Sequence, residues 1–432
     1  MKVRSTLPRR THVGMAILLV SNAFQSWSQD WSHRHAFAKS YWGLSLHGVP
    51  AMEDGLFEAE GESVQIFDRS AFVSPAVNIG ATHFWGHADF YVAINTVPFK
   101  IKEDNVVNRI GMGTFTGLRV YPWKVGDNKV RPYLGYKFSP WRYRQGDTPT
   151  TSYKTTRIKG MIDAGLGLAT DNGYFTLDVS KLLRPDFETY LSRTDASPDR
   201  WPEWTVSVGL NLALETTSVA ANPVNKALNK ELPLSNGKGL FFAAGPSSAF
   251  PVASSSYITE ERPYLDDQSF PIIFPDVALG WHFSKADAVV AVSQRTMTQK
   301  RSAYDFEQVI ARNSTILEAY KFLGDYHGFV PYLGAGVSRE RIGLEEWDAG
   351  DQITDVSYNP TPLYVVFGWD IRPSEKGDFW VLRTNLRIPP MLQLDHGRNN
   401  HKLSLQHMEF NFIQLVVYPQ RWRRARELSK DN

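Results

Sequence analysis

The residues that could do chemistry are few and scattered along this chain. His83 and His282 occupy equivalent places in two similar segments, which suggests a paired metal or proton-relay site, but no second ligand lies at a usable spacing from either histidine. A hydrolase would need serine, histidine and aspartate together, and the chain has no G-x-S-x-G motif. Because there are no cysteines, disulfides, thiolate metal sites and cysteine nucleophiles are excluded. We therefore predict no enzyme, no metal site and no cofactor, and we interpret both histidines as anchors at a membrane interface.

Two further patterns resemble ligand sites but have simpler interpretations. Gly111 with Gly113 and Gly165 with Gly167 have the G-x-G spacing of nucleotide loops, yet no helix follows either pair, so we expect small residues that face a crowded interior. Acidic residues close together in sequence could chelate a hard cation such as calcium, although their spacing matches no defined calcium loop, and we expect a solvated surface there. These acidic residues are Glu345, Glu346, Asp348 and Asp351.

The largest candidate set consists of charged residues that share one strand face with small residues. A period of two places alternate side chains on opposite faces of a strand, so these charges would point into a barrel whose apolar residues point outward. They could line an aqueous pore and set its selectivity, or they could pair across a filled lumen and serve only stability. The candidate lumen-lining residues are Arg109, Arg119, Arg157, Lys159, Asp163, Asp178, Glu318, Asp370, Arg383 and Arg387.

The elements that must position these charges are strands. From 204 to 215, apolar residues such as Leu210 alternate strictly with polar or small ones such as Asn211. Sixteen such segments occur, and each is close to the roughly 9 to 11 tilted residues that a transmembrane strand needs. The predicted strands lie near 40–48, 73–84, 87–97, 108–122, 130–143, 156–168, 173–182, 204–215, 238–246, 273–283, 286–296, 312–323, 329–339, 361–372, 378–388 and 408–418.

The connections between these strands alternate in length. Short polar turns such as 125–129 and 324–328 alternate with long links such as 183–203, 297–311 and 340–360. This sorting is typical of outer-membrane barrels, in which the short turns are periplasmic and the long loops extracellular. Tryptophans and a tyrosine near the predicted strand ends suggest aromatic girdles at the two lipid interfaces. They are Trp42, Trp85, Trp123, Trp141, Trp281, Trp369, Trp380 and Tyr418.

The two halves of the chain have similar sequences. Residues 131–139, RPYLGYKFS, return as 330–338, VPYLGAGVS, and residues 75–80 correspond to 275–280. Such self-similarity at a fixed distance indicates an internal repeat.

Each half resembles the eight-stranded outer-membrane β-barrel families, OmpW-like proteins and the membrane domain of OmpA-like proteins, over nearly all of the chain after residue 28. The resemblance implies an all-β fold, a transmembrane antiparallel β-barrel. Such barrels usually close with an apolar strand that carries a late aromatic, as 410–418 and Trp422 do here, whereas the first half stops at 214–217 without one. We therefore predict one barrel of about 16 strands built from two eight-strand repeats; the alternative is two eight-stranded barrels in tandem.

The first residues predict export. Lys2, Arg4, Arg9 and Arg10 precede an apolar run at 13–20, which is typical of a signal peptide and shorter than the roughly 20 residues of a spanning helix. The predicted division is residues 1–28 as signal peptide, 29–217 as first repeat, 218–237 as inter-repeat link, and 238–432 as second repeat, forming one barrel with the first.

Composition and pattern together predict a Gram-negative outer-membrane location. The net charge of +2 gives no electrostatic argument for nucleic acid. Expected partners are outer-membrane lipid and the barrel-assembly machinery, the latter through the C-terminal strand. The leading functional hypothesis is a porin-like passive pore or structural membrane protein; the alternative is a surface binding or adhesion protein that uses its long extracellular loops, and the third is an outer-membrane enzyme.

Overall fold

The computed structural model describes most of the chain after residue 37. The described ranges are 38–57, 65–83, 87–96, 101–103, 106–123, 129–145, 153–170, 173–213, 239–266, 273–324, 329–371, 380–388, 392–397, 401–428 and 430. The predicted signal peptide and inter-repeat link lie outside these ranges. Within them, no helix is both long enough and apolar enough to cross a membrane.

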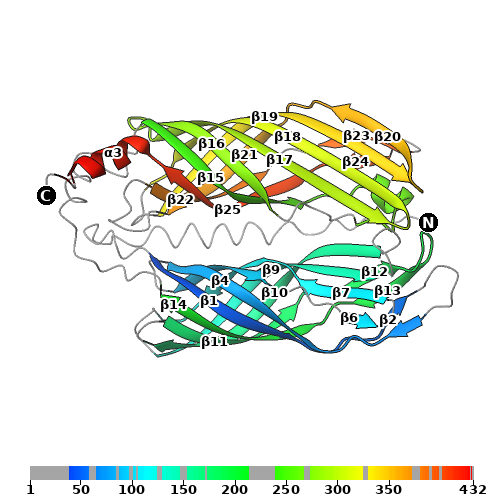
Figure 1. The fold of residues 1–432 in the computed structure, drawn as a ribbon. Coiled ribbons are helices and arrows are strands. Elements are labelled where there is room, and N and C mark those ends of the chain that lie inside the picture. The colour runs from blue at the N-terminus through cyan, green and yellow to red at the C-terminus, as the bar shows by residue number, and fades with distance from the viewer. Residues whose placement is uncertain are drawn as a thin grey trace, which may run out of the picture. The chain divides into compact units, whose positions relative to one another are not determined.

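The first half folds into a closed barrel of eight antiparallel strands (Figure 1). Around the ring the order is β1, β4, β5, β8, β9, β10, β11 and β14, and the ring closes where β14 pairs with β1. The strands are β1 (Ala38–Val49), β4 (Phe72–His83), β5 (Ala88–Asn95), β8 (Phe115–Val120), β9 (Val130–Gln145), β10 (Tyr153–Thr170), β11 (Gly173–Leu182) and β14 (Trp204–Ala213).

The second half forms an equivalent ring. Its order is β15, β16, β17, β18, β19, β21, β22 and β25, and it closes where β25 pairs with β15. The helix α3 (Pro419–Leu428) follows the last strand. The strands are β15 (Gly239–Pro251), β16 (Phe274–Phe283), β17 (Ala288–Ala303), β18 (Phe306–Phe322), β19 (Phe329–Asp348), β21 (Leu363–Ile371), β22 (Trp380–Ile388) and β25 (His407–Val417).

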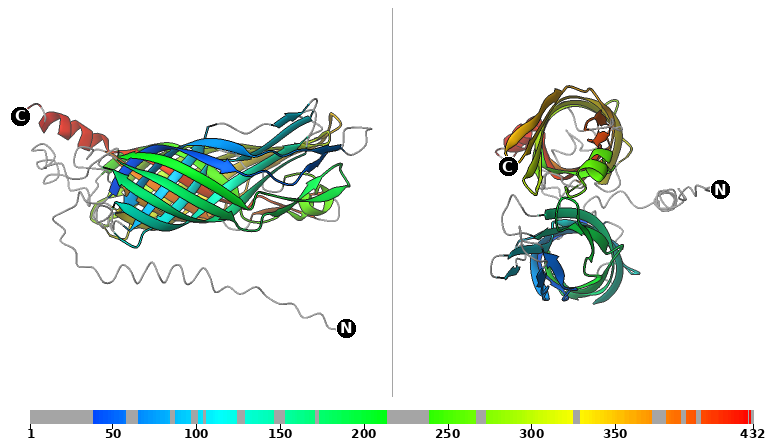
Figure 2. Two further views of the ribbon diagram at one scale, coloured as in Figure 1. Left: turned by 90° about the horizontal axis from the view of Figure 1, so that it is seen from below. Right: turned by 90° about the vertical axis from the view of Figure 1, so that its right-hand side faces the viewer.

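The prediction of a single sixteen-stranded barrel is wrong, and the alternative of two eight-stranded barrels is what the chain forms. The strand β14 hydrogen-bonds to β1 on one side and to β11 on the other, while β15 bonds to β25 and β16. Both strands therefore have their two edges occupied, and neither can pair with the other. Each ring, taken by itself, is closed in the right-hand panel of Figure 2.

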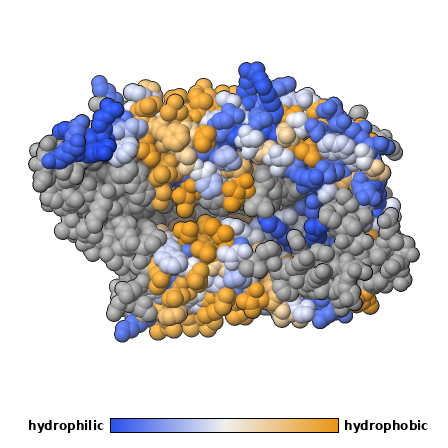
Figure 3. All heavy atoms as spheres, in the orientation of Figure 1, coloured by the Kyte–Doolittle hydropathy of each residue, from blue (hydrophilic) through white to orange (hydrophobic). Residues whose placement is uncertain are grey.

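Polar and apolar faces alternate around both rings as predicted. On β14, Leu210 faces outward with 39% of its surface exposed, whereas the neighbouring Asn211 is fully buried inside the barrel. Exposed Leu, Val, Ile and Phe side chains gather in a band that appears orange in Figure 3. Such a band is typical of the lipid-facing surface of a membrane barrel.

Each barrel has a short-turn end and a hairpin end. The short-turn end carries turns such as 284–287, and the hairpin end carries extra β-structure in the links predicted to be long. The link predicted at 297–311 is wrong, because β17 and β18 continue through it to a tight turn at 304–305. The other additions are β2 (Gly55–Phe57), β3 (Gln65–Phe67), β6 (Ile101–Glu103), β7 (Val106–Met112), β12 (Asp186–Tyr190), β13 (Ala196–Arg200), β20 (Asp351–Tyr358), β23 (Gln393–Asp395) and β24 (Lys402–Ser404).

The repeated sequence corresponds to a repeated cross-strand contact. Tyr133 on β9 lies opposite Gly165 on β10, and Tyr332 on β19 lies opposite Gly368 on β21, which is the equivalent position of the second ring. A Cβ added at Gly165 or Gly368 would stand 2.5 Å from the Cζ atom of the facing tyrosine. Each ring therefore needs glycine here so that the tyrosine ring can lie flat on the barrel wall.

Three details of the predicted strand faces are wrong. Ile110 and Met112, which the predicted inward position of Arg109 would turn toward lipid, are buried, because β7 ends at Met112 and the phase of alternation changes before β8 begins at Phe115. Trp141, predicted for an aromatic girdle, is fully buried at the hairpin end of the first barrel. Tyr418 points inward as well and packs against Phe241, whereas Trp42 and Trp281 are exposed as a girdle requires.

Candidate functional site: the two lumens and the hairpin end of the second barrel

The first lumen contains a lysine held between two aspartates. The Lys137 ammonium lies 3.1 Å from Asp163 Oδ1 and 4.0 Å from Asp178 Oδ1, and it donates a hydrogen bond of 2.6 Å to Ser180 Oγ. These four side chains come from the consecutive strands β9, β10 and β11, whose alternation turns all of them inward. A buried charge is tolerated only when it is paired, and here each carboxylate faces the same cation.

Aromatic side chains contact the charged groups of the first lumen. Arg119 lies 3.8 Å from Asp178 and over the ring of Tyr91, with its guanidinium carbon 4.1 Å from the ring centroid. Tyr91 in turn donates a hydrogen bond of 3.3 Å to Asp163. Because β5 and β10 are three places apart in a ring of eight strands, the Tyr91–Asp163 bond reaches across the lumen.

The second lumen contains a larger ionic network. Arg387 contacts Glu318 at 2.8 Å and Asp276 at 2.9 Å. Arg295 contacts the same Asp276 at 3.3 Å and also pairs with Glu409. The strands that carry Arg387 and Glu318, Arg387 and Asp276, or Arg295 and Glu409 are each three places apart, so all three pairs reach across the barrel.

Two more ion pairs lie on either side of this network. Arg383 makes a two-pronged contact with Asp370, at 2.7 Å and 2.8 Å. Arg312 pairs with Glu340 and lies 2.8 Å from the Nδ1 atom of His407 on β25, a strand directly opposite β18 in the ring. An eight-stranded barrel has an interior that side chains can just fill. In both lumens, described side chains from opposite parts of the wall contact one another across the middle.

The structure brings most of the predicted lumen residues together. Arg119, Asp163 and Asp178 lie in the first lumen, and Glu318, Asp370, Arg383 and Arg387 lie in the second, all of them buried. Arg157 and Lys159 are not in a lumen, because β10 extends past β11 at this point. Arg157 is partly exposed, and Lys159 donates a hydrogen bond of 2.6 Å to the carbonyl oxygen of Arg184. The side chain of Arg109 lies outside what the structure describes.

The sequence analysis missed several lumen charges that alternation could have identified. Lys137, for example, stands between the outward-facing Tyr136 and Phe138, and Arg295 continues the inward series of β17. Among the described residues, the missed charges that are buried on inward strand faces include Asp89, Arg131, Lys137, Asp276, Arg295, Arg312, Glu340 and Glu409.

At the hairpin end of the second barrel, Glu346 is a buried hydrogen-bonding centre. Its carboxylate, 1% exposed, accepts hydrogen bonds from Gln308 at 2.7 Å, Thr354 at 2.9 Å and Tyr257 at 3.0 Å, and it lies 2.9 Å from His396 Nε2. Burial by itself would raise the pKa of Glu346, but the bonds from His396, Gln308 and Thr354 outweigh it, so that its pKa is lowered. A carboxylate with this many donors holds the segments that supply them in one arrangement.

Two of those segments form a cap, which we define as residues 255–266 with the short helix η3 (Tyr257–Glu261) and the hairpin β23–β24 at 392–405. Ser255 Oγ donates a hydrogen bond of 2.9 Å to the Lys402 carbonyl, and His401 Nδ1 lies 2.6 Å from Glu261. In the right-hand panel of Figure 2 the green helix of the cap lies within the outline of the second ring. The cap packs on the inner face of the surrounding strands through Tyr257, Ile258, Tyr264, Leu265, Phe306, Ile310, Ile342, Leu344, Leu403 and Leu405.

Four strands extend beyond the apolar band and form what we call the protruding sheet: 296–303, 306–313, 341–348 and 351–358. The outward face of β19 carries the exposed charged residues Arg339, Arg341 and Glu345, so this sheet lies outside the membrane-facing part of the barrel. Within the described pairings, β20 bonds only to β19 and ends the sheet. Its other edge therefore carries backbone groups available to a partner, and Ile353 and Val356 on it are exposed.

The structure separates the acidic residues that were considered for cation binding and places one of the two histidines in a lumen. Glu345 is exposed on the protruding sheet opposite Asp355, whereas the adjacent Glu346 is buried beneath it. His282 is buried in the second lumen beside Tyr418, so its interpretation as an anchor at a membrane interface is wrong; the side chain of His83 lies outside the description. Among the residues that the structure describes, no group of three His, Asp or Glu side chains could hold a metal ion.

Comparison with known proteins gives likenesses of fold only. No family model and no curated protein matches the chain. Among solved structures, Neisserial surface protein A (NspA) is 15% identical, with 41% of this chain and 96% of that chain covered at a TM-score of 0.30. Ail, the attachment invasion locus protein of Yersinia pestis, is 12% identical over 42% and 98%, TM-score 0.28. The outer membrane protein OprG from Pseudomonas aeruginosa is 12% identical over 42% and 97%, TM-score 0.29.

These scores are too low to support a conclusion about activity. The assignment of the fold therefore depends on the strand pairing of this chain. Each half closes into its own ring of eight antiparallel strands with an outward apolar band. The predicted resemblance of each half to an eight-stranded outer-membrane barrel is thereby confirmed, and the chain is a tandem of two such barrels.

Proposed function

We propose that this chain is an outer-membrane protein that binds an extracellular partner through the hairpin end of its second barrel, with both lumens serving stability and not transport. The observation that carries the proposal is the filling of the lumens by ion pairs that reach from wall to wall, such as Arg387 with Asp276 and Arg295 with Glu409. A solute could pass only if several buried charges lost their partners, at a cost of about 3 to 5 kcal/mol for each broken pair.

The outer-membrane location is supported by the apolar band and by the sorting of the connections. Short turns at one end and β-structured extensions at the other are the arrangement of outer-membrane barrels, whose short turns are periplasmic. The hairpin end, with the protruding sheet, would then lie outside the cell.

The partner-binding role is supported by the free edge of β20. An exposed strand edge is a ready template for an extended segment of another chain, which adds as a further strand through main-chain hydrogen bonds. On the outward face beside this edge, two exposed acidic residues stand directly opposite each other, Glu345 on β19 and Asp355 on β20. Like charges opposite each other destabilise a sheet, so a basic partner would be favoured.

The first experiment separates a pore from a closed barrel. Refolded protein in planar bilayers is expected to show no steady unit conductance in salt solution. Reproducible channels of one size in the wild type, absent from a mock preparation, would contradict the closed-lumen proposal.

The second experiment tests orientation and uses the absence of native cysteine. Ile353→Cys on β20 is expected to react with a membrane-impermeant maleimide on intact cells, whereas Lys285→Cys in a short turn should react only after the cells are broken. Labelling in the reverse order would contradict the extracellular placement of the protruding sheet.

The third experiment tests the edge itself with an extended peptide of alternating lysine and threonine as probe. Wild-type protein is expected to bind it in a salt-dependent manner, and Asp355→Lys to bind it more weakly. Equal binding by both proteins would contradict the proposed site.

A further inference from the structure

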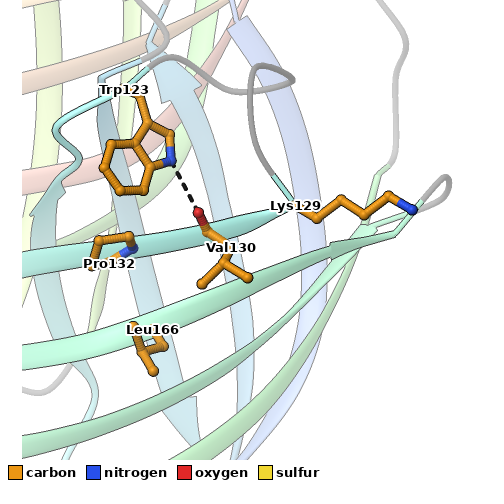
Figure 4. Close-up of a pocket in the computed structure, with 5 residues that line it drawn as sticks. All are labelled: Trp123, Lys129, Val130, Pro132 and Leu166. Carbon is orange, nitrogen blue, oxygen red and sulfur yellow. Dashed lines mark hydrogen bonds between the residues drawn. The ribbon is translucent and has the colours of Figure 1, made fainter.

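A groove lies on the outward face of the first barrel, at the short-turn end of the apolar band. It has a volume of about 450 Å³ and is lined by Trp123, Lys129, Val130, Pro132 and Leu166 (Figure 4). Val130 and Pro132 begin β9, and Leu166 stands opposite Pro132 on β10. The groove therefore opens between two adjacent strands, Trp123, and Lys129, which is the residue just before β9.

The walls of this groove are held in place before any ligand arrives. The indole Nε1 of Trp123 donates a hydrogen bond of 3.0 Å to the carbonyl oxygen of Val130, drawn dashed in Figure 4. This is the only polar group of the indole, so the bond fixes the orientation of the ring. Pro132 adds a side chain without rotamer freedom. A preorganised site loses little entropy on binding.

The chemistry of the groove changes from apolar to cationic along its length. At one end of the groove, the apolar side chains of Val130 and Leu166 are 48% and 45% exposed, as is usual on a lipid-facing surface. Lys129 stands at the turn, and in Figure 4 its ammonium extends away from the apolar walls. A lysine on a long flexible stem at this level places its charge among lipid headgroups while its stem stays on the apolar surface.

We propose that this groove holds one glycerophospholipid of the periplasmic leaflet. An acyl chain lies along Val130, Pro132 and Leu166 beneath the Trp123 indole, and the phosphate pairs with the Lys129 ammonium. The surrounding surface is lipid-facing, so the occupant must be a lipid, and the lysine selects for an anionic headgroup. This inference rests on the proposed membrane location and is independent of the partner at the protruding sheet.

Among the residues that the structure describes, the second barrel lacks one wall of an equivalent groove. Tyr121 and Phe322 hold equivalent places, since the amide of Tyr121 donates to His87 O and that of Phe322 to Asp287 O across the preceding hairpin. Trp123 lies two residues after Tyr121, and Gly324 lies two residues after Phe322, so Trp123 corresponds to Gly324. The site is therefore a property of the first barrel.

The test uses the refolded full chain in detergent, titrated with palmitoyl-oleoyl phosphatidylglycerol and followed by native mass spectrometry. The wild type is expected to retain one tightly held lipid. Lys129→Gln should weaken its binding about fivefold, the value of one cation near a lipid surface. Leu166→Trp should remove the tight site, because the larger side chain fills the groove.

Two matched controls separate this site from general lipid coating. Leu177→Trp changes another outward leucine, and Lys285→Gln another lysine of a short turn, and both should bind lipid as the wild type does. Lipid loss equal to that of the groove variants in either control, or no loss in Leu166→Trp, would overturn the proposal. Weakening by Leu166→Trp without any effect of Lys129→Gln would overturn the headgroup assignment. Failure of the wild type to insert into bilayers would instead refute the membrane location.

Discussion

Replacing Arg387 by methionine tests whether the lumen charges stabilise the second barrel. The Arg387 guanidinium forms ion pairs with two carboxylates, those of Glu318 at 2.8 Å and Asp276 at 2.9 Å. Arg387 and Arg295 are the two arginines that face the three acidic groups of this network, the third being Glu409. After the change, one guanidinium would remain for three buried carboxylates.

The expected loss of stability follows from this deficit of positive charge. Removing one partner of a buried ion pair costs about 3 to 5 kcal/mol, because the charge left behind has neither water nor a counter-ion. Methionine is flexible and close in length to the arginine stem, so the loss of packing is small. Arg387→Met should therefore lower the free energy of unfolding of the second barrel by about 3 to 5 kcal/mol.

The assay should report on the two barrels separately. Hydrogen exchange followed by mass spectrometry on refolded protein in micelles, across a urea series, gives protection for peptides from β18 and β22 and for peptides from β9 to β11. Only the second-barrel peptides should lose protection. The double variant Arg387→Met with Glu318→Gln removes one charge of each sign and should recover at least about 2 kcal/mol of the loss. Arg339→Met, on the exposed outward face of β19, is the control and should change stability by less than about 0.5 kcal/mol.

Two results would refute this reasoning. One is a cost below about 1 kcal/mol for Arg387→Met, which would mean that water reaches the carboxylates and that the lumen is open. The other is an equal loss of protection in β9 to β11, which would mean that the barrels do not unfold as separate units.

The remaining predictions concern closure, packing and pH. Residues 29 to 217 expressed alone should refold in detergent into a protease-resistant species that migrates differently before and after heating, because β14 already pairs with β1; a half that only aggregates would contradict independent closure. Gly165→Ala should destabilise the first barrel by about 1 to 3 kcal/mol in a urea titration, since its Cβ would stand 2.5 Å from Tyr133, whereas Gly167→Ala, with its nearest atom at 3.5 Å, should be nearly neutral; similar effects would argue against the tyrosine contact. The pKa of Glu346 is lowered in the folded protein, so its contribution to stability is present above the pKa of the unfolded chain and is lost as pH falls through the folded value. Cap peptides 255–266 should therefore lose protection in acid in the wild type, and much less so in Glu346→Gln, whose protection should already be low at neutral pH; an unchanged acid response in Glu346→Gln would assign it to another group.

Strand positions were predictable from the sequence because each strand of a membrane barrel has one face toward lipid. All sixteen predicted segments overlap a ring strand, and the assignment of Leu210 to the outer face and Asn211 to the lumen is confirmed. The equivalence of the halves also persists in the structure, since both PYLG motifs place a tyrosine over a glycine of the next strand.

Closure could not be predicted from alternation, because the identity of a strand's neighbour is fixed by backbone hydrogen bonds. The side chains of β14 show which face is lipid-facing but do not distinguish β1 from β15 as its partner. Two narrow lumens can hold so many charges because residues that the sequence analysis missed, such as Lys137 and Arg295, supply counter-ions. Arg157 and Lys159 were misplaced for another reason: alternation continues along β10 after the barrel wall has ended on the side of β11.

The different ionic networks of the two lumens bear on how a duplicated chain avoids misassembly. Equivalent strands of the two halves share a register, so β9 and β19 could in principle exchange places while the chain is still unfolded, as in domain swapping. Four residues after the repeated tyrosine, β9 carries Lys137 and β19 carries Gly336. A first barrel built with β19 would leave Asp163 and Asp178 without this cation, at a cost of several kcal/mol. The buried charges thus favour assembly of each barrel from its own strands over any hybrid of the two halves.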